Sequence, residues 1–309
     1  MDKDWRTMMD VGIVHFMAFP IIKDEGPIVE SAAQIAADDF FDVLEVRRSE
    51  HREVTEGLKR VAEASGLQYG IGAQPGLLLN KLSLNDPDKA GRRAAVSEVK
   101  RSIDAAVELD APMVAILTGP DPGDDEREKQ IELLVESLVE LCDYGREKGG
   151  ERPVWISLEQ FDREYEKKSL VGPSDVAVRV AYLVRDRAEN FGLCVDLSHI
   201  PLLHESIEDC LFALKDHLIH VHAGNCIMRD PKLPGYGDAH PRFGHPDGEN
   251  GVPELRKYLE TLIYIGYFES AVPTRKPVFT FEVKPMEGET PELIIANTKR
   301  TFRQAWAAL

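Results

Sequence analysis

Four residues of the types that bind divalent metal ions follow one another along the second half of the sequence. Glu159, Asp196, His222 and Glu282 each lie at or near the end of a short apolar run, as in Val-Trp-Ile-Ser-Leu-Glu159 and Phe-Thr-Phe-Glu282. Burying a carboxylate at such a position is costly unless it is paired, and three carboxylates brought together repel one another. One divalent ion removes both penalties, and three carboxylates with one imidazole suit Mn²⁺, Mg²⁺, Co²⁺ or Zn²⁺. We therefore predict a single metal site built from these four side chains.

The run Ile-His220-Val-His222 leaves the choice of imidazole open. Residues two apart on a strand point to the same side, so His220 faces the same way as His222. His222 is the expected ligand, and His220 remains an alternative.

The elements that must position these residues alternate between strand and helix. Short runs rich in β-branched residues predict eight strands, each followed by a segment with helical spacing of apolar residues. The strands are expected near residues 11–16, 43–47, 69–74, 113–118, 154–159, 193–196, 218–222 and 278–283. With no Pro/Gly-rich or charged linker between them, these units favour one closed (β/α)8 barrel, a TIM barrel, as a single α/β domain over residues 1–309. An open doubly wound sheet would carry a glycine-rich turn after its first strand, and no G-x-G-x-x-G pattern occurs in the sequence.

Four helices are indicated most clearly by apolar spacing or by their ends. The first carries Ile131, Leu134, Val135, Leu138, Leu141 and Cys142 on one face; the second follows Pro173-Ser174-Asp175, interpreted as an N-terminal cap; the third carries Leu255, Tyr258, Leu259 and Leu262 and ends at Gly266; the last spans about 291–306. Two long loops, 161–172 and 223–251, would emerge at carboxyl ends of strands, where active sites of such barrels lie.

Composition excludes several classes of function. The net charge of −17 repels a phosphate backbone, so we expect no nucleic-acid partner. No apolar run reaches the ~18 residues that a membrane span needs, and no secretory signal is recognised at the start, so we expect a cytoplasmic protein without a membrane partner. The four cysteines are widely spaced, which favours small buried side chains over disulfides or a zinc knuckle.

The order Glu159, Asp196-x-x-His199, His222, Glu282 resembles the xylose isomerase-like TIM barrels, the superfamily of sugar phosphate isomerases and epimerases, over nearly the whole chain. This resemblance implies that the four residues hold one divalent ion, with Mn²⁺ expected before Mg²⁺, Co²⁺ or Zn²⁺. It implies that Glu159 and Glu282 also act as acid and base, that His199 hydrogen-bonds a substrate oxygen and that Arg229 contacts a substrate hydroxyl. It further implies a small carbohydrate substrate and a homodimer or homotetramer.

Two other polar residues at predicted strand ends are expected to face the same mouth. His15 ends the first predicted strand and is a candidate substrate-binding group, with a structural histidine as the alternative. Gln74 ends the third and is expected to bind a hydroxyl group. Glu45 and Arg47, at the end of the second, are interpreted at least as well as an ion pair inside the barrel.

The predicted reaction is a sugar isomerisation or epimerisation by metal-assisted proton transfer through an enediolate. The alternative is a lyase or dehydratase that eliminates a group β to a carbonyl in a 3-keto glycoside or inosose. Tyr165, where the epimerases carry a second glutamate, and the long loop 223–251 favour that alternative. Two further readings are disfavoured: an apurinic-site endonuclease with Asp238-x-His240 as extra ligands, because of the acidic charge, and a degenerate sugar-binding barrel, because all four ligand types are present.

Overall fold

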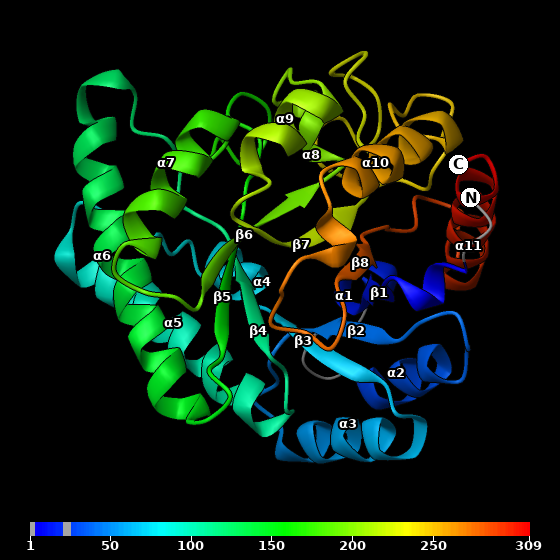
Figure 1. Ribbon diagram of the computed structural model, residues 1–309, viewed down its shortest axis with the longest axis horizontal. Coiled ribbons are helices and arrows are strands. Elements are labelled where there is room, and N and C mark those ends of the chain that lie inside the picture. Colours follow the sequence, from blue (N-terminus) through cyan, green and yellow to red (C-terminus); the bar gives the residue numbers. More distant parts are fainter. Residues whose placement is uncertain (1–3, 21–25) are drawn as a thin grey trace.

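Eight parallel strands close into a barrel in chain order, which confirms the predicted (β/α)8 architecture. The computed structural model describes residues 4–20 and 26–309 (Figure 1). The strands are β1 (Asp10–Val14), β2 (Val43–Val46), β3 (Gln68–Gly72), β4 (Met113–Ile116), β5 (Trp155–Glu159), β6 (Phe191–Asp196), β7 (Leu218–Ala223) and β8 (Val278–Phe281). Each pairs in parallel with the next, and β1 pairs with β8 to close the sheet.

Helices surround the barrel and connect its strands (Figure 1). They are α1 (His15–Ala18), α2 (Ile28–Ala36), α3 (Arg52–Ser65), α4 (Gln74–Leu79), α5 (Lys89–Glu108), α6 (Asp124–Gly149), α7 (Ser174–Arg185), α8 (His199–Leu202), α9 (Ile207–Leu214), α10 (Val252–Tyr264) and α11 (Pro291–Ala307), with the 3-10 helices η1 (Trp5–Thr7) and η2 (Tyr267–Glu269). The four helices predicted most clearly are confirmed as α6, α7, α10 and α11. Gly266 follows α10 with a φ of 78°, a left-handed conformation that glycine adopts without strain.

The predicted cap of α7 is wrong in detail. The residue before the helix is Pro173, whose side chain cannot accept a hydrogen bond, and Ser174 already belongs to the first turn. The Ser174 hydroxyl instead donates to Glu205, in the segment between α8 and α9.

Five strands, β1, β2, β3, β4 and β8, end one or two residues earlier than the apolar runs predicted. β1 stops at Val14, β3 at Gly72 and β4 at Ile116, so that His15 and Gln74 are the first residues of α1 and α4. The apolar run of β1 continues into α1 through Phe16 and Met17, and apolar composition alone does not separate a strand from a short helix. At α4 the sequence did hold a signal, because Pro75 occupies a first-turn position that favours proline.

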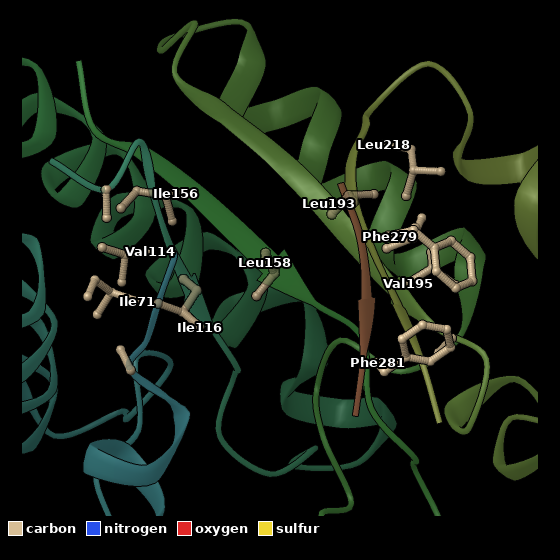
Figure 2. Packing of buried hydrophobic residues seen from close by; sticks show 14 of the residues in the cluster. Ile71, Val114, Ile116, Ile156, Leu158, Leu193, Val195, Leu218, Phe279 and Phe281 are labelled. Carbon is tan, nitrogen blue, oxygen red and sulfur yellow. The ribbon is translucent and has the colours of Figure 1, made fainter. Parts of the chain in front are cut away.

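Alternation along the strands separates an apolar layer from a polar barrel interior. Val114, Ile116, Ile156 and Leu158 are buried between sheet and helices, and Figure 2 shows them in one cluster with residues of β3 and β6. On β8, Phe279 and Phe281 pack against Phe302 of α11, with ring centroids 6.0 and 5.7 Å away. The intervening residues, such as Ser157 and Thr280, therefore face the other side of the sheet, where the functional residues also lie.

All four cysteines are buried and unbonded, as predicted. In the described part of the chain, no helix is long and apolar enough to cross a bilayer.

Candidate metal centre and active site

The four predicted metal ligands come together at the carboxyl ends of β5 to β8. One potential ligand atom from each of Glu159, Asp196, His222 and Glu282 lies within 4.8 Å of the others. His222 Nδ1 is 3.3 Å from Glu159 Oε1 and 3.0 Å from Glu282 Oε2. The parallel register explains the convergence, since Asp196 and His222 are paired neighbours and Glu282 follows the last residue of β8.

The chemistry of this cluster fits a divalent cation. Glu159 Oε1, Asp196 Oδ2 and His222 Nδ1 are buried and have no hydrogen-bond partner among the residues that the structure describes. Buried polar atoms without partners are rare in proteins and are costly when they carry charge. A cation coordinated by these three atoms and by Glu282 would compensate them, and mixed carboxylate and imidazole donors suit Mn²⁺, Mg²⁺, Co²⁺ or Zn²⁺.

Glu45 lies below the cluster, inside the barrel, and determines the direction of both histidines of β7. Its Oε2 is 3.1 Å from His222 Nε2, and its Oε1 is 2.7 Å from His220 Nε2. His222 therefore turns Nδ1 toward the other three ligands, whereas His220 is engaged with Glu45 and does not belong to the four-residue group. Room for this carboxylate comes from Gly70, where an added Cβ would lie 3.0 Å from Glu45 Cγ. Burial alone would raise the pKa of Glu45, but His222 and His220 hold it well below its usual value.

Changing Glu45 to glutamine is expected to weaken metal binding without touching a ligand. A carboxylate that accepts the second ring N–H of a ligating histidine fixes the ring and increases its basicity, and its loss costs roughly 10–100-fold in metal affinity. We expect that loss for Glu45→Gln in a competition titration with a fluorescent chelator. An affinity equal to that of the wild type would show that Glu45 has no positioning role.

The cluster opens into a cavity of about 390 Å³ at the carboxyl end of the barrel. Glu159, His222 and Glu282 line it, together with Gln74 at the start of α4. The Gln74 Nε2 donates a 2.9 Å hydrogen bond to Glu159 Oε2, so this glutamine holds one of the two glutamates in place. The structure thus places Gln74 at the predicted mouth of the barrel, where its partner is Glu159, a contact that the sequence had not predicted.

His199 is buried beside this cavity and is held by two acceptors. Its Nδ1 is 2.8 Å from the carbonyl oxygen of Gln160, and its Nε2 is 3.1 Å from Asp238 Oδ1. Burial alone would lower the pKa of His199, but Asp238 and neighbouring carboxylates raise it to about 10. Both ring nitrogens of His199 are therefore engaged with protein acceptors. His199 is also not among the described residues that line the cavity.

Three residues of the long loops, Lys167, Asp238 and His240, line the cavity although the sequence did not predict it. His240 Nε2 lies 2.9 Å from Asp238 Oδ1, and Lys167 Nζ lies 3.3 Å from Asp238 Oδ2. Burial alone would lower the pKa of His240, but Asp238 raises it to about 9. The sequence had connected Asp238 and His240 only with the endonuclease alternative. The unusual length of loops 161–172 and 223–251 was the one signal that their residues could reach the active site.

Asp162 explains why loop 161–172 presents Lys167 and not Tyr165. Its carboxylate accepts backbone hydrogen bonds from Tyr165, Glu166 and Lys167 at 2.8, 2.8 and 2.9 Å. In the resulting turn the Tyr165 hydroxyl lies 3.2 Å from His204 Nε2, away from the cavity lining, while Lys167 extends toward Asp238.

Arg229 does not reach the cavity. Its side chain is 61% exposed, its Nη1 donates to the carbonyl oxygen of Pro246 at 3.3 Å, and its Nε lies 3.9 Å from Glu249. The long loop folds back on itself at this point, so the expected contact with a substrate hydroxyl has no support in this geometry.

His15 also faces away from the cavity. Because β1 ends at Val14 and His15 is the first residue of α1, the ring turns toward α2, where its Nε2 lies 2.9 Å from Ser31 Oγ, and it stacks on Phe19. Ser31 Oγ donates to carbonyl oxygens of Pro27 and Ile28, so it accepts from a neutral His15. The structural alternative describes this histidine better than the substrate-binding role.

Burial, with Arg47 nearby, lowers the pKa of His15 from 6.5 to about 4. The unfolded chain therefore takes up this proton near pH 6.5, whereas the folded protein does so only near pH 4. The corresponding stability is complete above pH 6.5 and decreases as the pH falls, by about 3 kcal/mol in total. His15→Gln keeps a donor for Ser31 but does not titrate. We expect the free energy of unfolding of this variant, measured by urea denaturation between pH 6.5 and pH 4, to lack this part of the decrease. The same pH dependence in both proteins would contradict the assignment.

Comparisons with known proteins agree with this architecture. A family model described as xylose isomerase-like TIM barrel matches residues 32–299. A search of curated proteins gave no match. Among solved structures, L-ribulose 3-epimerase has a TM-score of 0.73 at 15% identity and covers 97% of each chain. A D-tagatose 3-epimerase-like protein has a TM-score of 0.72 at 18% identity, covering 97% of this chain and 98% of that one. The IolI protein with a bound zinc atom has a TM-score of 0.72 at 16% identity, covering 97% and 99%.

At these identities the solved structures show a shared fold. The family model extends over most of the sequence and includes the segments that carry the four-residue cluster. The chain belongs to the xylose isomerase-like TIM barrel family.

Proposed function

We propose that the protein is a divalent-metal-dependent isomerase or epimerase acting on a keto- or aldo-sugar or a derivative of one. The observation that carries this proposal is the placement of Glu159 and Glu282, which both line the cavity and both lie within 3.3 Å of His222 Nδ1. Two carboxylates that face one small cavity from different strands can remove and return a proton at a substrate carbon.

Glu159, Asp196, His222 and Glu282 would hold the ion, for which we propose Mn²⁺ first. When bound, such an ion acts as a Lewis acid that polarises a substrate carbonyl and acidifies the adjacent C–H. Gln74 orients Glu159 through its 2.9 Å hydrogen bond, and Glu45 orients His222. Held in this way, Glu159 would exchange the substrate proton with little reorganisation, which is what proton transfer requires. The likeness to L-ribulose 3-epimerase and to a D-tagatose 3-epimerase-like protein adds support.

A second candidate, a lyase or dehydratase, shares the first proton abstraction and needs an acid for the leaving group. The specific observation in its favour is that the two long loops bring His240 and Lys167 to the cavity. His15, which the sequence suggested as a substrate-binding residue, is directed to Ser31 and does not supply this acid.

An NMR screen of keto-sugars and 3-keto glycosides in D₂O, with Mn²⁺ supplied, tests both candidates. Isomerase or epimerase chemistry is expected to introduce deuterium at a carbon next to the carbonyl while all substituents are kept. Release of water or of an aglycone would instead establish the lyase. If no sugar exchanges a proton, the proposed function is wrong.

A further inference from the structure

The cavity of the candidate active site has two chemically unlike sides. The side at the ends of β5 to β8 carries the carboxylates and His222. The opposite side comes from α1, α4 and the residues next to them and also includes the polar side chains of Gln74 and Arg47. Its apolar members are called the apolar wall: Phe16, Met17, Pro20, Pro75, Leu78 and Leu79. Nothing in the metal-assisted proton transfer uses these side chains.

The apolar wall exposes large aliphatic side chains at the mouth of the cavity. In α4, Leu77 is buried in the core and anchors the helix, but Leu78 and Leu79 are 44% and 74% exposed. Figure 1 shows α4 at the centre of the view, within the ring of outer helices. Exposed apolar surface that continues into a pocket commonly marks a contact with a ligand.

The base of the apolar wall is preformed. An added Cβ on Gly72 would lie 2.8 Å from the Phe16 ring, so this ring packs directly against the glycine backbone. Gln74 stands between the two sides, since it lines the cavity next to Phe16 and donates to Glu159. A ligand that touches Glu159 with one part therefore has the apolar wall beside its other part.

We propose that the substrate is a sugar with an apolar substituent, the aryl or alkyl aglycone of a glycoside, which lies against the apolar wall while the reacting carbon faces Glu159 and Glu282. A free sugar would turn hydroxyl groups toward the apolar wall, where these hydroxyl groups find no hydrogen-bond partner, and this loss disfavours binding. An aglycone would instead bury the exposed leucines. This inference rests on the proposed function for the orientation of the sugar, but the wall itself can be tested by binding alone.

The test compares ligands that differ only in the aglycone. Methyl and phenyl β-D-glucopyranoside are titrated into the Mn²⁺-supplied protein and followed by ligand-detected NMR. The phenyl compound is expected to bind about tenfold more tightly, from the apolar surface that it buries. Leu79→Ser and the double variant Leu78→Ser/Leu79→Ser are expected to reduce that preference at least about threefold. Leu293→Ser, which changes an equally exposed leucine of α11 outside the cavity lining, should keep it.

Three results would overturn the subsite: equal binding of both glycosides, a preference unchanged in Leu79→Ser, or a change in oligomeric mass of the leucine variants without a change in preference. The last would identify the apolar wall as a subunit contact. The two proposals fail separately. A phenyl preference without deuterium exchange on any keto-sugar would keep the subsite and reject the function, whereas exchange without a preference would do the reverse.

Discussion

Replacing His222 with alanine is expected to release the divalent ion from the protein. The wild type should contain about one ion per chain, because one group of four ligands converges at the ends of β5 to β8. His222 is its one imidazole, and its Nδ1 lies between Glu159 and Glu282. Loss of a supporting residue alone costs up to ~100-fold in metal affinity, so loss of the ligand should cost more than that. Elemental analysis measures the metal content of the variant. The rise in the thermal unfolding temperature on Mn²⁺ addition measures its remaining affinity, since a bound ion stabilises the folded state.

His220→Ala is the matched control for this experiment. His220 lies two residues away on the same strand and binds the same carboxylate, Glu45, but it is not a member of the four-residue group. It should keep the ion with a much smaller loss of affinity. The reverse result, an ion kept in His222→Ala and lost in His220→Ala, would transfer the ligand role to His220. A wild type that takes up no ion when Mn²⁺ is supplied would reject the metal site.

The convergence of the four candidate ligands follows from rules that a sequence displays directly. Short apolar runs rich in β-branched residues identify the strands, and parallel strands of a closed barrel end at the same face. Residues at the ends of four successive strands must therefore meet, whatever the lengths of the segments between them. For this reason the barrel was predicted correctly, and so was the grouping of Glu159, Asp196, His222 and Glu282, although several strand boundaries were not.

The partners of those residues could not be predicted in the same way. Glu45 and His220 are 175 positions apart, and their contact depends on which strands face each other across the closed barrel. The pairing of His199 with Asp238 depends on the path of a long loop, for which no periodic rule exists. His15 shows the sensitivity of such predictions, because β1 ends just before it and its ring therefore points toward Ser31 and not into the cavity.

Glu159→Gln and Glu282→Gln are each expected to reduce proton exchange by roughly 10²–10⁴-fold for the epimer whose proton that glutamate removes, because an amide cannot take up the proton. The amide oxygen can still act as a ligand, and each variant is therefore expected to keep most of its metal. Glu287→Gln, in the exposed segment after β8, is the control of the same chemical type and should retain full exchange. Deuterium uptake followed by NMR and metal content are measured on the same samples.

The two variants also separate one-base from two-base chemistry. Glu159 and Glu282 approach His222 from β5 and from the end of β8, and Gln74 holds only Glu159. If each glutamate serves one face of the substrate, each variant should abolish epimerisation yet still allow exchange from one of the two epimers, and the permitted epimer should differ between the variants. Loss of exchange from both epimers in only one variant would assign the proton to that glutamate alone. That outcome is the one that an elimination requires, since a lyase removes one proton and passes the second transfer to a different acid, for which His240 and Lys167 are the residues in place.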